Sequence, residues 1–405
     1  MAELMGIEYL RRKLEDKRRR VRLRYDFYDM KKHIPDFGIS TPPALRSWCS
    51  TLGWCGKAVD SLTDRLVFRG FKEDVFDLNG IYNQNSPDIL FRSAIQGALI
   101  AACSFLYIYE GDDGFPRIEA IDGGNATGII DRVTGLLKEG YAVLERGEYG
   151  EPKLEAYFIP EQTVYLEKGQ LPRVYNHAVR HPLLVPVIYR ADATRPFGHS
   201  RISRACMDIV SSAVRTVKRS EISAEFYSFP QKWVTGLEEG AEKFDKWQAT
   251  MASLLAFTKD GDGDRPTIGQ FQQGAMTPHL DQLRMFASLF AGETGLTLDD
   301  LGFPSDNPSS AEAIRSQHEN LRLAAKRAQQ DFSIGILNAG FLAACLRDDF
   351  PYLRRQLYST IPSWGPIFEP DATQLAGLGD AVYKLNQSAP GIFTEERLRE
   401  LTGIG

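Results

Sequence analysis

The chain has 405 residues, with 48 lysines and arginines, 53 aspartates and glutamates and a formal net charge of −5 at pH 7. This length predicts two or more units, and an apolar fraction of 43% excludes global disorder. The negative balance disfavours a protein that grips nucleic acid over a broad surface, because that task recruits lysine and arginine to neutralise phosphates. No apolar run approaches the roughly 20 residues that span a bilayer, and no secretory signal opens the chain, so we expect a cytosolic protein without membrane contact.

Residues that could carry chemistry do not form a recognisable site. The five cysteines are odd in number and scattered, which indicates buried thiols rather than disulfides or metal ligands. His177 and His181, four apart, come closest to a metal pair, but their strand-like flanks disfavour it. Residues 198–200, Gly-His-Ser, match half of a nucleophile elbow, but Ile202 replaces the second glycine. We therefore expect no catalytic residue, no metal and no cofactor.

The first half of the chain predicts a basic helix, two packing helices and then strands. Residues 4–33 predict a helix with nine Lys or Arg between Arg11 and Arg24, either a solvated face or a contact with an acidic partner or nucleic acid. Apolar periodicity predicts helices over 57–66 and 88–102. Short apolar runs between glycines and prolines predict strands at 105–109, 129–130, 140–144, 156–159, 163–166 and 185–189. The expected fold class is α+β.

Residues 200–228 predict a long helix with Ser200 as its N-cap. Its apolar and small residues recur at intervals of three and four, which leaves Arg201 and Lys218 on other faces. A narrow seam with charged flanks suits lateral packing between identical neighbours, although an ordinary amphipathic surface helix explains the same periodicity. The seam positions that we expect to pack between subunits are Ile202, Ala205, Ile209, Ala213 and Val217.

The next part of the chain predicts an excursion between two helices. Residues 231–276 form a compositionally separate insert with a strand near its end, at 267–271, and an apolar helix then resumes over 280–290. A connection rich in Gly, Pro and Asp leads to Ser-Ser-Ala-Glu at 309–312, a capping box. The helix that follows is expected to end near Arg347, a length on the order of 55 Å that suits a spoke across an assembly.

The part of the chain after Pro351 is shorter and mixed. It predicts a proline-rich loop that includes Pro362, a helix near 372–385 and a final helix that begins at Thr394. We expect a terminal helical cap without a recognised function.

Three stretches in a fixed order carry a resemblance to a known family. Residues 59–66 read Val-Asp-Ser-Leu-Thr-Asp-Arg-Leu, residues 186–202 hold the strand and the Arg-Pro-Phe-Gly-His-Ser motif, and residues 306–314 read Asp-Asn-Pro-Ser-Ser-Ala-Glu-Ala-Ile. The chain resembles the portal proteins of tailed bacteriophages, of the SPP1-like type, from about residue 20 to about residue 345.

The resemblance implies an elongated α+β subunit with an α/β wing, a helical stem, a small α/β clip and a helical crown. The implied boundaries are 1–199 for the wing, 200–229 and 278–295 for the stem helices, 230–277 for the clip, 296–308 for the tunnel loop, 309–348 for the long wing helix and 349–405 for the crown-like region. Within the tunnel loop, the residues expected to face DNA are Asp299, Asp300, Asp306 and Asn307. Their carboxylates would repel phosphates and favour sliding over binding.

The resemblance also implies a function and a set of partners. Portal proteins form a homo-oligomeric ring, of twelve subunits in the virion, at one capsid vertex, and double-stranded DNA passes through it transiently without sequence specificity. The implied partners are the large terminase, the major capsid protein, a scaffolding protein where one exists, and a head-completion or adaptor protein. The implied location is the virion, with assembly in the host cytoplasm. The alternative is a sequence-independent DNA-binding protein that uses the basic helix over 4–33.

Overall fold

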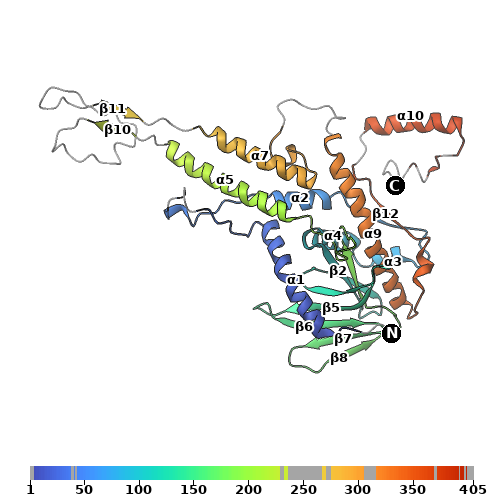
Figure 1. Cartoon of the computed structure of the whole chain (residues 1–405). Coiled ribbons are helices and arrows are strands. Elements are labelled where there is room, and N and C mark those ends of the chain that lie inside the picture. The colour runs from blue at the N-terminus through green and yellow to red at the C-terminus, as the bar shows by residue number, and fades with distance from the viewer. Residues whose placement is uncertain are drawn as a thin grey trace, which may run out of the picture. The chain divides into compact units, whose positions relative to one another are not determined.

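The computed structural model describes residues 4–37, 41, 43–228, 232–235, 267–270, 275–304, 316–368, 372–391, 393–395 and 398 (Figure 1). Its contacts divide the chain into two units. The first unit comprises Met1–Lys32, Gly53–Met207 and Ala291–Gly405, and the second comprises His33–Leu52 and Asp208–Phe290. Helices and antiparallel strands both contribute, which confirms the α+β class. Each unit is described by itself below.

A five-stranded antiparallel sheet in the first unit follows the order of the chain, β4-β5-β6-β7-β8. Short turns join its neighbours, so each strand pairs with the next. The strands are β4 (Ala126–Ile130), β5 (Leu137–Arg146), β6 (Pro152–Ile159), β7 (Gln162–Glu167) and β8 (Arg173–Asn176). Helix α1 (Ile7–Tyr28) lies beside this sheet (Figure 1). Its Leu10 and Leu14 pack with Tyr141 and Val143 of β5 in one apolar cluster.

A second, three-stranded sheet of the first unit has the order β3-β2-β9. Its strands are β2 (Cys103–Glu110), β3 (Pro116–Ile121) and β9 (Leu184–Ile188). The first six residues of β2 are all buried, because α4 (Pro87–Ala101) and α9 (Glu319–Arg347) both pack against this sheet. Gly335 of α9 permits that approach, since a Cβ there would lie 2.8 Å from the Pro186 carbonyl oxygen.

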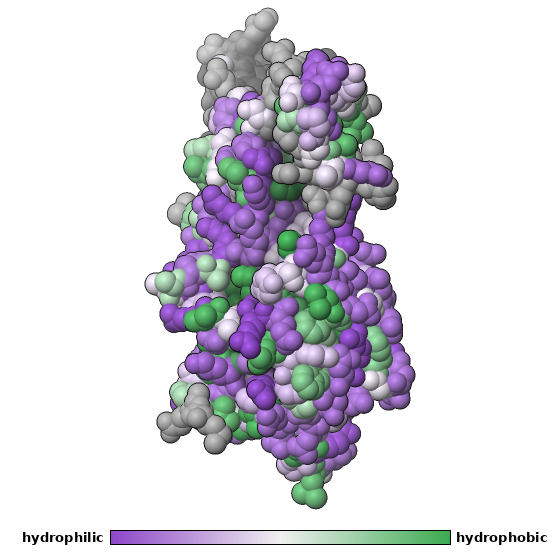
Figure 2. All heavy atoms as spheres, turned by 90° about the vertical axis from the view of Figure 1, so that its right-hand side faces the viewer, coloured by the Kyte–Doolittle hydropathy of each residue, from purple (hydrophilic) through white to green (hydrophobic). Residues whose placement is uncertain are grey.

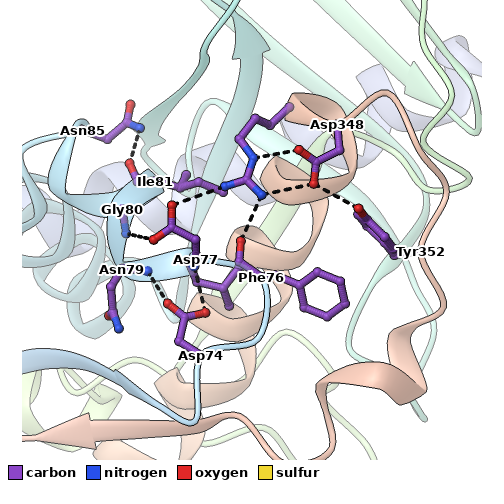
Figure 3. A network of polar contacts seen from close by, with 11 residues as sticks. Asp74, Phe76, Asp77, Asn79, Gly80, Ile81, Asn85, Asp348 and Tyr352 are labelled. Carbon is purple, nitrogen blue, oxygen red and sulfur yellow. Dashed lines mark hydrogen bonds and ion pairs between the residues drawn. The ribbon is translucent and has the colours of Figure 1, made fainter.

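A polar network fixes the start of α3 (Leu78–Asn83) to the end of α9 (Figure 3). The Asp74 carboxylate accepts hydrogen bonds from the backbone N–H groups of Leu78 and Asn79, at 2.8 and 2.7 Å. The Arg347 guanidinium donates to the Phe76 carbonyl at 3.1 Å and to both oxygens of Asp348, at 2.9 and 3.0 Å. The orphan donors at the helix start are therefore satisfied within the unit.

A small sheet joins distant parts of the first unit. Strand β1 (Phe68–Lys72) pairs antiparallel with β12 (Ile361–Trp364). The expectation that Pro362 lies in a loop is therefore wrong: a two-stranded sheet has only edge strands, and edge strands tolerate proline. The helix expected near 372–385 is confirmed as α10 (Ala372–Ser388), whereas most of the helix expected from Thr394 lies outside the described residues.

The second unit contains the greater part of two helices, α5 (Arg204–Ser228) and α7 (Thr277–Thr294). The Thr216 hydroxyl lies 3.1 Å from the Gln282 side-chain oxygen, and the Ser223 hydroxyl lies 3.3 Å from His279 Nε2. Strands β10 (Lys232–Thr235) and β11 (Thr267–Gln270) form an antiparallel pair, which confirms the strand expected at 267–271. The rest of the insert lies outside the described residues.

Helix α5 begins later than the sequence predicts. Ser200 does not cap α5: its hydroxyl donates to the Ile100 carbonyl at 2.6 Å, and Ser203, directly before the helix, accepts from the Cys206 N–H at 3.1 Å. Helix α9 ends at Arg347 as expected and begins at Glu319, while the capping box at 309–312 lies outside the described residues.

The visible face in Figure 2 is mainly hydrophilic, and its apolar side chains lie in small scattered groups. Scattered apolar residues of this kind are normal on a protein surface. None of the helices in the described part of the chain combines the length and the apolar character needed to cross a bilayer.

Candidate functional site

The two described aspartates of the acidic connection occupy different environments. Asp299 and Asp300 begin the 3-10 turn Asp299–Leu301, and Asp299 is exposed. The Asp300 carboxylate accepts from the N–H and the hydroxyl of Thr297, each at 3.0 Å, and lies 3.5 Å from His318. Burial alone would raise the pKa of Asp300, but these hydrogen bonds and His318 lower it. Asp300 therefore shapes the turn, whereas Asp299 is presented at the surface.

The other two residues expected to face DNA, Asp306 and Asn307, lie outside the described residues.

The seam expected to pack between subunits divides into buried and accessible positions. Ile202 and Ala213 are buried within the chain's own fold, at 1% and 0% exposure. Ala205 is exposed, and Ile209 and Val217 are half-buried. The buried positions already pack inside the subunit. Of the five seam positions, only Ala205, Ile209 and Val217 are therefore available to another molecule.

Two charged residues of the same region do not lie on a solvated flank as expected. Arg201 is 8% exposed, and its guanidinium donates to the carbonyls of Ala58 at 2.6 Å and Thr294 at 2.8 Å. Lys218 is 4% exposed and pairs with Asp36 at 3.0 Å. Periodicity could not reveal this, because long cationic side chains can reach buried acceptors from many helical positions.

The loop between β9 and α5 has a locked backbone. Gly198 has φ +76°, and a Cβ there would lie 2.1 Å from the Tyr189 carbonyl oxygen, so only glycine fits. The His199 ring lies 2.7 Å from Asp192, and this contact lowers the pKa of the carboxyl group. The Ser200 hydroxyl is already committed to the Ile100 carbonyl. The His-Ser pair thus has a structural arrangement that holds the loop.

The basic helix α1 is held to the five-stranded sheet along one side. Arg11 donates to both oxygens of Glu155, at 3.1 and 2.8 Å, and Tyr141 also donates to this carboxylate. The contact with Glu155 raises the pKa of Arg11. Buried Glu139, at 1% exposure, accepts from the N–H groups of Met5 and Gly6 at 2.8 and 3.2 Å. These contacts fix the rotation of α1, and hence where its other cations point.

The histidines singled out in the sequence do not converge on a common site. Burial lowers the pKa of both His177 and His181. Within the described ranges, no three His, Cys, Asp or Glu side chains lie close enough together to hold a metal ion.

Comparisons with known proteins give two sequence relatives. The chain is 24% identical over 418 residues to the portal protein of Mycobacterium phage D29, covering 96% of this chain and 83% of that protein. It is 25% identical over 404 residues to the portal protein of Mycobacterium phage L5, covering 92% and 80%. No protein-family model matches the chain.

Solved structures with a similar arrangement come from gene transfer agent particles. One chain belongs to the neck of a native particle computed with C12 symmetry, with a TM-score of 0.48, 14% identity and coverage of 93% of this chain and 98% of that chain. Another belongs to a native virion particle, with a TM-score of 0.45, 14% identity and coverage of 95% and 99%. The sequence similarity to the two mycobacteriophage proteins, which extends over nearly the whole chain, identifies this protein as a relative of the phage portal proteins.

Proposed function

We propose that the chain is the subunit of a phage portal, the head-tail connector at one capsid vertex through which double-stranded DNA is packaged and ejected. The observation that carries this function is the similarity to two portal proteins over more than nine tenths of the chain. The function is that of a conduit, and it involves no enzymatic step by this chain. Its place is the virion, after assembly in the host cytoplasm.

We assign the regions of a portal subunit to this chain as follows. The first unit supplies a wing, built from the two larger sheets and α9, while α5 and α7 supply the stem and the β10-β11 pair belongs to the clip. The clip would meet the large terminase and later an adaptor protein. The wing would meet the major capsid protein and, where one exists, a scaffolding protein. The tunnel loop would be the connection around Asp299.

Accessible apolar positions on the proposed stem helices support lateral contacts between subunits. Ile209 and Val217 of α5 are half-buried, and Leu280, Met285 and Leu289 of α7 are 63, 49 and 53% exposed. Large exposed apolar side chains on α7, together with half-buried ones on α5, indicate a partner surface. A head-to-tail contact between identical subunits closes into a ring when its rotation permits, and we propose twelve copies in the virion.

The purified protein is expected to form closed rings with a central channel in negative-stain images. The double variant Ile209→Glu/Leu289→Glu should shift the protein to monomers, because two charges per subunit would have to be buried at every interface. Glu221→Gln, at an exposed polar position of the same helix, should leave the rings intact. A strictly monomeric wild-type protein at capsid-assembly concentrations would contradict the proposed function.

The tunnel-loop assignment predicts a charge effect on DNA movement. Asp299→Lys changes the charge by +2 per subunit at an exposed position. In an oligomeric ring, carboxylates that repel DNA phosphates would thus be replaced by ammonium groups that attract them. Packaging or ejection should slow, and more so at low salt, as measured by DNA translocation in reconstituted particles. Asp300→Asn serves as the comparison, because that side chain shapes the turn and its loss should alter stability first. An Asp299→Lys rate equal to wild type at every salt concentration would place this loop away from the channel.

The alternative function, DNA binding by a monomer through the basic helix, has less support. Arg11 is paired with Glu155, Arg18 lies 3.9 Å from Glu15, and Lys13, Lys17 and Arg24 are half-buried. Much of the basic run is thus not free to line a broad footprint. Salt-sensitive affinity for DNA in the monomer, with no ring formed, would favour this alternative.

A further inference from the structure

Four cations of α1 form a stripe that is separate from the side held by Glu155. They are Lys13, Lys17, Arg20 and Arg24, spaced by four, three and four residues. This spacing places them on one face of a helix. Two further cations, Arg195 and Arg204, come from the loop after β9 and from the first residue of α5.

All six cations line one cavity of about 630 Å³ in the first unit. Its lining residues include the hydroxyl side chains of Thr127 and Ser203, and the aromatic ring of Phe197, but no carboxylate. Carboxylates do lie around its rim: Asp192 accepts from the Arg195 backbone N–H at 2.6 Å, and Glu293 accepts from Ser203 at 2.7 Å.

The interactions that these cations make are with neutral groups. Lys13 donates to the Gly128 carbonyl at 2.7 Å, Lys17 to the Cys103 thiol at 3.1 Å, and Arg24 lies at 3.5 Å from the Ala101 carbonyl. Across the ranges that the structure describes, none of the six forms an ion pair with an Asp or Glu side chain. Among the described residues, the cations of the cavity therefore have no salt-bridge partner.

Like charges held together in a partly buried site favour an anionic ligand. Burial, and then Lys17, lowers the pKa of Lys13, while burial, Arg20 and Arg195 lower that of Arg24. A bound anion would relieve this repulsion. Its attraction to the cations would also be stronger than at an open surface, because solvent screens charges less in the cavity. Besides Lys13, four arginines and one lysine supply many donors, and guanidinium groups match the geometry of phosphate oxygens.

The cavity favours phosphate groups over a nucleobase. The Lys13 and Lys17 ammonium groups lie 5.0 and 5.8 Å from the Phe197 ring centroid, so this aromatic ring already makes cation–π contacts. Stacking of a base needs an open aromatic face. We propose that this cavity is a binding site for a ligand with several phosphate groups, either a free oligophosphate or the phosphodiester backbone of DNA. The site does not require the oligomeric assembly, since all its residues belong to one unit of one subunit.

The test uses the full-length protein with tripolyphosphate as the probe, measured by titration calorimetry at about 50 mM and about 200 mM salt. Arg20→Gln/Arg204→Gln removes two exposed cations of the cavity, and we expect affinity to fall about tenfold. The control, Arg19→Gln/Arg22→Gln, removes the same charge from exposed positions of α1 outside the cavity. Its affinity should stay within about twofold, as expected for screened surface charge.

A competing short DNA duplex distinguishes the two sources of phosphate. Displacement of tripolyphosphate by the duplex assigns the site to the DNA backbone, and retention assigns it to a free oligophosphate. The proposal is overturned if the wild-type protein binds neither probe, or if both variants lose affinity equally. It is also overturned if the cavity variant alone abolishes rings while no anion binds, because carboxylates of a neighbouring subunit would then be the occupant.

Discussion

Replacement of Lys218 by methionine is expected to lower the free energy of unfolding of the second unit by about 3 kcal/mol. Lys218 is 4% exposed and donates to Asp36 at 3.0 Å and to the Arg46 carbonyl at 3.1 Å. Removal of the ammonium group takes one charged partner away from the Asp36 carboxylate, whose side chain is 15% exposed, in a site that water barely reaches. Urea denaturation followed by circular dichroism measures the change.

A double-mutant cycle separates the ion pair from simple packing. Lys218→Met/Asp36→Leu should recover much of the loss, because an apolar pair of similar volume no longer carries the desolvation cost of a buried carboxylate. Arg219→Met is the matched control on the same helix: it removes a half-buried cation, whose guanidinium lies 5.5 Å from the Phe37 ring, and should cost under about 1 kcal/mol. Equal losses in Lys218→Met and Arg219→Met would show that the buried pair contributes nothing special.

Replacement of Arg201 by methionine is expected to cost about 2 to 4 kcal/mol in the first unit. The guanidinium donates to the Ala58 carbonyl in α2 (Trp54–Thr63) and to the Thr294 carbonyl at the end of α7, at 2.6 and 2.8 Å. Methionine retains much of the apolar part of the arginine side chain but has no N–H donors. Both carbonyl acceptors therefore lose a buried hydrogen-bond partner. Thermal unfolding of the full chain, together with protease sensitivity near the α7 end, reports the effect.

The pair Arg201→Lys and Arg204→Met tests that explanation. Lysine carries a point charge and cannot span two carbonyls in the fixed geometry of a guanidinium, so Arg201→Lys should recover less than half of the loss. Arg204 is exposed three residues further on, and its replacement should leave stability unchanged. A full rescue by lysine would mean that charge alone, rather than the two directed hydrogen bonds, stabilises this junction.

Local patterns were sufficient for many elements of this fold. The helix expected over 88–102 is α4, and the helix expected to end at Arg347 does so. The strands expected between 105 and 189 are all present: the last is shifted by one residue, and the others have longer bounds. Each of these segments has a clear apolar period or a turn residue at its boundary, and such signals act over a few residues. The order of three short motifs also pointed to the portal family, which the two sequence relatives support.

The features that the sequence did not reveal depend on long-range pairing. Strand β1 pairs with β12 almost 300 residues later, and neither partner has enough apolar alternation to be recognised alone. The segment His33–Leu52 belongs with the second unit, where Asp36 pairs with Lys218, a contact that no local pattern encodes. Sequence spacing does align Lys13, Lys17, Arg20 and Arg24 on one face of α1.

By itself, then, the sequence determined the class of fold, the position of most long helices and a resemblance to the portal family, because periodicity, turn chemistry and motifs can be read from the chain without its fold. Tertiary structure alone decided which charges are buried and which converge. Arg201 and Lys218 are covered because distant carbonyl and carboxylate groups meet them, and the cavity gains Arg195 and Arg204 because the loop after β9 returns to α1. The free energy of a charge depends on the three-dimensional arrangement of its solvent and partners, and that arrangement exists only after the chain has folded.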